Sequence, residues 1–339
     1  MSESPVSHLT PLGFTWKMYD PFLFCAHHLD NFPAGNERLG PAASLAGRQI
    51  GQDFTLKDGW RMYHGDVVPG FPAHPHRGFE TVTVVLDGFV DHSDGSGAAG
   101  RYGNGDVQWM TAGSGMQHAE MFPLLKQDGP NRTELFQIWL NLPRAKKMVP
   151  PHYKMLWAED MTRTQHTDKQ GKTTRITLIA GTLDTLKALE PAPDSWAADP
   201  ENEVAIWIIA LEAGAKWQVP AAKSTVGRTL YFFEGKGLRA VGQEIPGYHS
   251  FKAEPGVELE LEAASGEVRL LLLQGKPIAE PVVQYGPFVM NTEQEIYQTY
   301  AEYQSTQFGG WAWDRDDPVH PRTQGRFARY ADGSEETRG

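Results

Sequence analysis

The stretch that decides the fold runs from Gly70 to Phe122 and reads GFPAHPHRGFETVTVVLDGFVDHSDGSGAAGRYGNGDVQWMTAGSGMQHAEMF. It contains two short pairs of polar residues, His74 with His76 and His118 with Glu120. Side chains two positions apart on a β-strand point to the same face, so each pair presents both of its polar groups to one side. If the two strands are neighbours, three imidazoles and one carboxylate meet at one point.

This donor set predicts a metal site. Imidazole with carboxylate suits a borderline divalent ion such as Fe²⁺, with manganese, nickel, cobalt and copper as alternatives, and no cysteine accompanies the pairs to favour zinc. Four protein ligands leave two positions of an octahedral ion for substrate, water or dioxygen. Glu80 follows His76 by four residues, so on an unbroken strand it faces the same side. It is an alternative to Glu120 as the fourth ligand, or a group that orients an imidazole.

The composition is that of a folded protein of about two domains, with 339 residues, of which 40% are hydrophobic and 22% charged. A net charge of −11 argues against nonspecific binding to nucleic acid or to an anionic membrane. No apolar run is long enough to span a bilayer, and the chain does not open on a signal-peptide core. The single cysteine, Cys25, forms no intrachain disulfide and is expected to be buried and inert. We therefore expect a cytoplasmic protein, or a nuclear one in a eukaryote.

Short strands separated by turn signals predict an all-β protein. The segment from Thr81 to Leu86, for example, ends at the turn pair Asp87-Gly88. A second β-rich region runs from Arg175 to about Gln284, and two such regions of similar size suggest a duplicated barrel. The predicted domains are a metal-binding N-terminal barrel over residues 1–148, a metal-free C-terminal barrel over 149–290, and a helix with a polar tail over 291–339.

The structure of the two chain ends and of the segment between the two β-rich regions is predicted less clearly by the sequence. Residues 1–12 are largely polar and are expected to be frayed. The segment from Arg144 to Asp160, with its Pro150-Pro151 pair, is interpreted as the connection between the barrels. Beyond Gly309 the tail is either disordered or laid over a barrel by its aromatic residues, and the sequence leaves this open.

One helix is predicted from about Glu293 to Ser305. Thr292 and Glu295 form a capping box at its start. Ile296, Tyr300 and Tyr303 then lie on one face, which predicts where the helix packs.

Four further motifs are interpreted as structural. The glycine pattern from Gly95 to Gly100 lacks a following helix, so it predicts a hairpin and no nucleotide site. The adjacent residues His27 and His28 face opposite ways on a strand and cannot serve one metal. His249 stands alone in the second β-rich region. Asn131-Arg132-Thr133 is a glycosylation sequon only in a secreted protein.

Three segments resemble the pirin family, a branch of the cupins: HPHRGFETV from His74, GDVQWMTAGSGMQHAEM from Gly105 and EPVVQYGPFVMNT from Glu280. The resemblance extends from about Phe14 to Gly309. It implies a bicupin, that is, two cupin-type β-barrels followed by a short C-terminal helix, with metal in the N-terminal barrel alone.

The same resemblance implies the ligands and the metal. They are His74, His76, His118 and Glu120, usually binding iron, which gives Glu80 a supporting role. The chain departs from the usual pattern at two positions. Phe122 stands where the second cupin motif usually has Asn, and Ala73 stands where relatives often carry Asp.

Pirins are linked to two different roles. Some resemble flavonol 2,3-dioxygenases such as quercetinase, which implies a small flavonol-like substrate, O₂, and Glu120 acting as both ligand and base. Others are regulators that bind a protein partner, with the oxidation state of iron as the switch. We take the iron-dependent dioxygenase as the first interpretation. The redox-sensing regulator is the alternative, and a scaffold that iron merely stabilises is the third.

Overall fold

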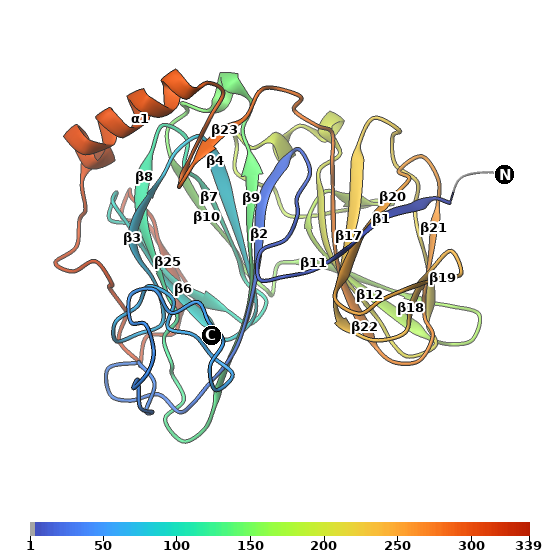
Figure 1. Cartoon of the computed structure of the whole chain (residues 1–339), viewed down its shortest axis with the longest axis horizontal. Helices are drawn as coiled ribbons and strands as arrows, with labels where there is room; N and C mark the ends of the chain where they lie inside the picture. Colours follow the sequence, from blue (N-terminus) through green and yellow to red (C-terminus); the bar gives the residue numbers. More distant parts are fainter. Residues whose placement is uncertain (1–3) are drawn as a thin grey trace. The chain divides into compact units, whose positions relative to one another are not determined.

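The computed structural model describes residues 4–339, which form two units built mainly from antiparallel β-strands (Figure 1). One unit comprises Cys25–Ala158 and Glu280–Gly339, and we call it the histidine barrel because it carries His74, His76 and His118. The other comprises residues 4–24 and Glu159–Ala279, and we call it the second barrel.

Two large sheets form the histidine barrel, and a two-stranded sheet of β23, Val283–Tyr285, and β24, Phe288–Met290, belongs to the same unit. One of the large sheets has five strands in the order β10-β7-β4-β9-β2, and the other has six in the order β26-β25-β6-β5-β8-β3. The bounds are β2 Phe22–Phe32, β3 Gly70–His76, β4 Phe79–Asp87, β5 Phe89–Asp94, β6 Ala99–Gly103, β7 Val107–Thr111, β8 Met116–Met121, β9 Asn131–Asn141, β10 His152–Leu156, β25 Arg326–Arg329 and β26 Glu335–Arg338.

The second barrel has two large sheets, of seven strands in the order β1-β20-β17-β22-β15-β12-β11 and of four in the order β16-β21-β18-β19, and a two-stranded sheet of β13, Thr182–Leu183, and β14, Leu186–Lys187. The bounds are β1 Val6–Pro11, β11 Thr162–Thr167, β12 Thr173–Ala180, β15 Ala205–Leu211, β16 Lys216–Val219, β17 Gly227–Gly235, β18 Leu238–Ala240, β19 Gln243–Ile245, β20 His249–Ala253, β21 Leu259–Ala263 and β22 Val268–Gly275. Alternate residues of its strands form one apolar core. The inward-facing positions in the middle of these strands are therefore apolar, as the alternation of side chains on a strand requires.

Several strand predictions are confirmed. The segment predicted at Thr81–Leu86 lies within β4, and the predicted second β-rich region contains β15 and β22. The all-β prediction with a short C-terminal helix is confirmed as well, because the only helices of the described residues are one α-helix and a few short 3-10 turns.

The N-terminal segment is not frayed, so that prediction is wrong for its described part, and residues 1–3 lie outside it. Strand β1 pairs with β20 in antiparallel register, from Val6 opposite Ala253 to Pro11 opposite His249. Figure 1 shows the dark blue β1 beside β20. The prediction failed because it took polar side chains as a sign of a frayed segment. An edge strand exposes much of its surface to water, so polar side chains are common on it.

The segment from Arg144 to Asp160 is also more than a connection. It contains β10, which pairs with β7 along its length, from His152 opposite Thr111 to Leu156 opposite Val107. The chain passes from the histidine barrel to the second barrel after Ala158 and returns to the histidine barrel after Ala279. Residues 4–24 also belong to the second barrel. The spatial division therefore differs from the consecutive one drawn at residue 148.

The helix α1, Glu293–Thr306, begins where the capping box predicts. Thr292 Oγ1 accepts a hydrogen bond from Glu295 N at 3.2 Å, while the Glu295 carboxylate accepts one from Asn291 N at 3.0 Å. Ile296 is buried against Phe288 of the short strand β24, Phe288–Met290, as the predicted face requires. Among residues 4–339 no helix is long and apolar enough to cross a membrane.

The tail is laid over the histidine barrel. Strand β25 pairs with β6, with Phe327 opposite Arg101, so the β25–β26 hairpin extends the six-stranded sheet. Arg101 is 0% exposed and binds both carboxylate oxygens of Asp91 at 2.6 and 2.7 Å. The same guanidinium donates to the carbonyls of three tail residues, His320, Pro321 and Gln324.

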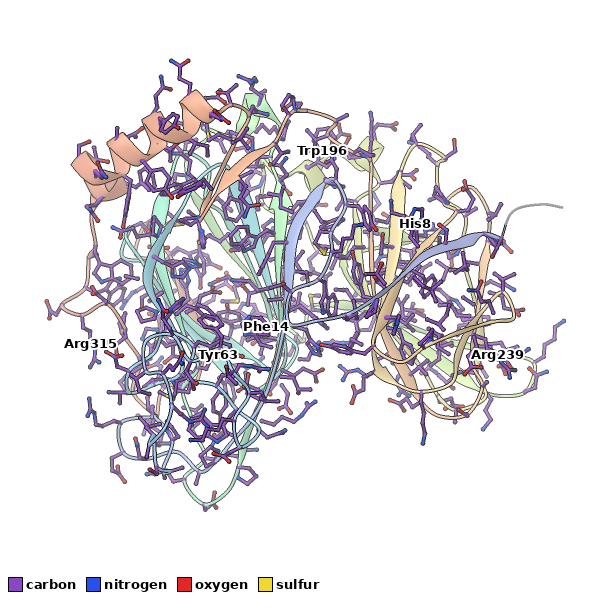
Figure 2. The ribbon with its side chains drawn as sticks, viewed as in Figure 1. His8, Phe14, Tyr63, Trp196, Arg239 and Arg315 are labelled. Carbon is purple, nitrogen blue, oxygen red and sulfur yellow. The ribbon has the colours of Figure 1, made fainter. Side chains whose placement is uncertain are left out.

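Arg101 should therefore be a major contributor to stability. Arg101→Ala leaves Asp91 buried without its cation and the three tail carbonyls without their donor, so it should lower the free energy of unfolding by about 3–5 kcal/mol. Arg315→Ala is the matched control, because Arg315 is exposed on the same tail and pairs with Asp317 (Figure 2). Its effect should stay within about 0.5 kcal/mol in chemical denaturation. Equal effects of the two substitutions would contradict this role.

Candidate metal centre

The three histidines lie together inside the histidine barrel. His74 and His76 come from β3 and His118 from the neighbouring β8, and one nitrogen from each lies within 4.8 Å of the others. Their ring centroids are 4.5 Å apart for His74 and His118 and 4.9 Å apart for His76 and His118. The period-two spacing of the first pair and its alignment with the second strand produce this convergence.

A β-bulge fixes which residue of β3 faces His118. Phe71 lies opposite Glu120 and the next registered pair is His74 with His118, so β3 holds one extra residue in between. Without the bulge Ala73 would take the place of His74, because regular pairing would bring position 73 opposite 118. The Ala73 amide instead donates to the tail carbonyl of Asp316 at 2.7 Å.

The imidazoles are suited to hold a metal ion. His118 is 0% exposed, and neither of its ring nitrogens has a hydrogen-bond partner among the described residues. His76 Nδ1 is likewise buried without a partner, whereas His74 Nδ1 lies 2.8 Å from the carbonyl oxygen of Pro72. That bond places the proton on Nδ1 and leaves the Nε2 lone pair of His74 available. Buried polar atoms without partners are rare, and a metal would provide a partner for one nitrogen of each ring.

Burial also keeps the three rings neutral, which is the state that binds metal. It lowers the pKa of His74 to about 4, and it lowers the pKa of His76 and of His118 well below the usual value, with the neighbouring histidines adding to the effect. At neutral pH every imidazole of the group therefore offers a lone pair without first losing a proton.

Glu120 lies beside this group but is held by other partners. Its Oε1 accepts from Thr83 Oγ1 at 3.0 Å and its Oε2 from Gln137 Nε2 at 2.6 Å, while His118 Nε2 lies 3.8 Å from Oε2. Burial raises the pKa of this carboxyl, and nearby His92 partly offsets the increase. Glu120 is thus close enough to act as a fourth ligand, and its raised pKa makes it a better proton acceptor than an ordinary carboxylate.

Glu80 does not join the three histidines. The turn at Gly78, with φ of +87°, separates β3 from β4, so the unbroken strand on which the alternative depended does not exist. Glu80 is buried and accepts a hydrogen bond from Thr111 Oγ1 at 2.7 Å. Phe122, at the other departure from the cupin pattern, packs edge-on against Phe71 and Tyr63; Figure 2 labels Tyr63.

Sequence reasoning missed the polar residues around the histidines. Thr83 and Gln137 are direct cross-strand partners on β4 and β9 and both bind Glu120. His92 of β5 lies opposite Glu120, stacks on Tyr153 with ring centroids 4.8 Å apart, and approaches Asp94 Oδ2 at 3.3 Å. A signal was present, since Thr83 and Gln137 interrupt apolar strands at inward-facing positions.

The motifs interpreted as structural have structural surroundings. Gly95–Gly100 turns between the paired strands β5 and β6, which confirms the hairpin. His27 lies 3.2 Å from Glu134, whereas His28 packs edge-on against Tyr63. Cys25 is fully buried, as predicted, and burial raises the pKa of its thiol. In the second barrel, His249 Nδ1 lies 2.9 Å from the Gly247 carbonyl.

The lowered pKa values predict an acid-sensitive apoprotein. His74 titrates near pH 6.5 when unfolded and near pH 4 when folded, so between these values the unfolded chain binds more protons. The free energy of unfolding of metal-free protein should therefore fall as the pH falls from about 6.5 to about 4, by up to about 1.4 kcal/mol per pH unit for one histidine. His74→Gln should show a shallower slope in urea unfolding at several pH values. An unchanged slope would contradict the assignment.

Two family models match the chain, the pirin model over residues 10–140 and the pirin C-terminal cupin domain over residues 206–309. The chain belongs to the pirin family. It is 38% identical over 245 residues to a Pseudomonas aeruginosa protein provisionally named quercetin 2,3-dioxygenase, which covers 70% of this chain and 79% of that one. It is 35% identical over 254 residues to pirin of Mus musculus, covering 73% and 80% of the two chains.

A solved structure extends the comparison to the fold. The quercetin 2,3-dioxygenase of Acinetobacter baumannii superposes with a TM-score of 0.68 at 27% identity, over 90% of this chain and 96% of that one. The predicted bicupin architecture is thus confirmed. The β25–β26 hairpin lies beyond both family models.

Proposed function

We propose that this pirin is an iron-dependent dioxygenase that cleaves flavonol-like small molecules with O₂. The observation that carries the proposal is the group of three neutral imidazoles, two of which have buried nitrogens without a partner, placed next to a carboxylate whose pKa is raised. Two relatives named as quercetin 2,3-dioxygenases, one by sequence and one by structure, support the choice of substrate class.

In this proposal His74, His76 and His118 hold the metal, and Glu120 is the fourth ligand. The donor set is nitrogen-rich with one oxygen and no sulfur, which fits iron and several other divalent transition metals. Once bound, iron supplies the Lewis-acid and redox chemistry that a reaction between an organic molecule and dioxygen requires.

Glu120 supplies the base. A flavonol hydroxyl that reaches Glu120 can transfer its proton to Oε2, the oxygen nearer to His118, because burial has raised the pKa of this carboxyl. Thr83 and Gln137 hold the carboxylate in place by donating to one oxygen each, so little reorganisation accompanies the transfer. Trp139 packs against His76 with ring centroids 5.4 Å apart and offers an aromatic surface beside the site.

The proposal is tested by isotope labelling. Iron-loaded protein is given quercetin under ¹⁸O₂, and the products are analysed by mass spectrometry. A dioxygenase should place both atoms of one O₂ into its products, and metal-free protein should form none of them. Iron bound without turnover of any flavonol would contradict the proposal and favour the regulator that binds a protein partner.

A further inference from the structure

The second barrel contains a cavity of about 520 Å³ that the proposed function does not use. Its walls come from the ends of β15, β17 and β22 and from three connecting segments around residues 181–191, 197–204 and 220–222. One of these segments includes the 3-10 turn η2, Trp196–Ala198, whose first residue is labelled in Figure 2. All lining residues belong to this barrel, so the cavity is complete within one unit.

A row of three residues crosses the floor of the cavity. Ala205 of β15 and Arg228 of β17 both lie opposite Gln274 of β22. Two positions further along, Trp207 and Leu230 belong to the apolar core of the barrel, as does Leu272 two positions before Gln274. Because side chains two apart share a face, the row also points inward. A guanidinium therefore stands at the end of an otherwise apolar interior.

Arg228 is buried without a full set of partners. It is 3% exposed; its Nε donates to Gln274 Oε1 at 2.8 Å, and Gln274 in turn donates to the Glu203 carbonyl at 3.2 Å. Its Nη1 has no hydrogen-bond partner, and the Glu203 carboxylate acts on the guanidinium electrostatically without forming a salt bridge within residues 4–339. Burial lowers the pKa of Arg228 to about 10, so the group remains charged at neutral pH. A buried, unpaired cation is unfavourable unless an anion joins it.

We propose that this cavity, the Arg228 cavity, binds a small monocarboxylate with an apolar body. The planar guanidinium matches a carboxylate and would bind it at the edge that lines the cavity, while Gln274 holds the Arg228 side chain in place by accepting from Nε. The rest of the ligand would contact Trp207, Leu189, Pro191 and Pro220, which supply apolar wall.

The charges around the opening favour a singly charged ligand. The lining includes the acidic residues Asp184, Glu190, Asp199 and Glu203, against Lys187 and Arg228 as the basic ones. Because this lining is net negative, a phosphate dianion would meet about twice the repulsion that a monocarboxylate meets, and one negative charge is enough to pair with Arg228. The site lies in the barrel without the histidine group, so it is independent of the proposed dioxygenase activity.

The test is calorimetric titration of benzoate into the full-length, metal-free protein, which removes any binding of carboxylate to iron. Benzoate should bind saturably, and benzyl alcohol and phosphate should bind much more weakly. Arg228→Met should weaken benzoate binding roughly tenfold to a hundredfold, since a charge-assisted hydrogen bond is lost. Lys187→Ala, which removes an exposed lysine of the same lining, should leave binding nearly unchanged. No saturable benzoate binding, or equal losses in both variants, would overturn the proposal, and tighter phosphate binding would overturn the ligand class.

Two further measurements separate binding from folding. Without ligand, Arg228→Met should melt no lower than the wild type, because the substitution removes an unpaired buried charge. A large loss of stability would show that Arg228 serves the fold and would overturn the proposal. Ala222→Leu narrows the cavity while leaving Arg228 in place, and it should also weaken benzoate binding. Unchanged affinity in this variant would place benzoate elsewhere and overturn the assignment.

Discussion

His118→Ala should lose both bound metal and flavonol-dependent oxygen uptake. His118 is the fully buried ring between the other two imidazoles and Glu120, and neither of its nitrogens has another partner. Substitutions that only disturb the surroundings of a metal ligand already weaken affinity about 10- to 100-fold. The loss of a ligand should exceed this, so the variant should be isolated with little metal, as measured by elemental analysis.

The matched control is His249→Ala. His249 is a partly exposed histidine of the second barrel whose ring lies beside the Gly247 carbonyl. This variant should keep the wild-type metal content and oxygen uptake. Stoichiometric metal in His118→Ala, or an equal loss in His249→Ala, would show that the histidine group is not the metal site.

Glu120→Gln should separate metal binding from turnover. The amide is isosteric with the carboxylate, so it can still accept from Thr83, and Gln137 can turn its own amide to donate or accept as needed. Three imidazoles remain to hold the metal, but the proton acceptor is lost. Turnover should fall about 10²- to 10⁴-fold while most of the metal is retained. Steady-state rates and metal content of the same preparation test both parts.

Glu80→Gln is the control for this prediction. Glu80 is equally buried but accepts its hydrogen bond from Thr111, which a glutamine oxygen can also receive. It should therefore retain both metal and turnover. If Glu80→Gln lost activity while Glu120→Gln kept it, the roles of the two carboxylates would have to be exchanged.

Spacing along the strands was enough to predict which histidines meet. Two residues share a strand face wherever the strand is regular, so His74 with His76 and His118 with Glu120 could be paired from the sequence. The same spacing rule gives the wrong answer wherever a strand is irregular. The bulge before His74 and the turn at Gly78 decide which residue faces His118 and why Glu80 does not, and both are set by tertiary pairing.

Long-range pairing explains the other differences. Strand β1 and the β25–β26 hairpin form only because distant strands present an edge to them, and polar residues at an edge give no strong signal. Arg101 and Arg228 carried a signal that could have been used. Each is a charged residue buried on a strand of the structure, and such a residue must find a partner inside the protein.

Iron-dependent dioxygenase activity is tested most directly by oxygen uptake of the iron-loaded wild type, measured with an oxygen electrode before and after quercetin is added. The measurement is repeated with the metal-free protein. We expect oxygen uptake that begins when quercetin is added, requires iron, and consumes O₂ in proportion to the flavonol lost. No uptake by protein shown to contain iron, or uptake that persists after the metal is removed, would contradict this expectation.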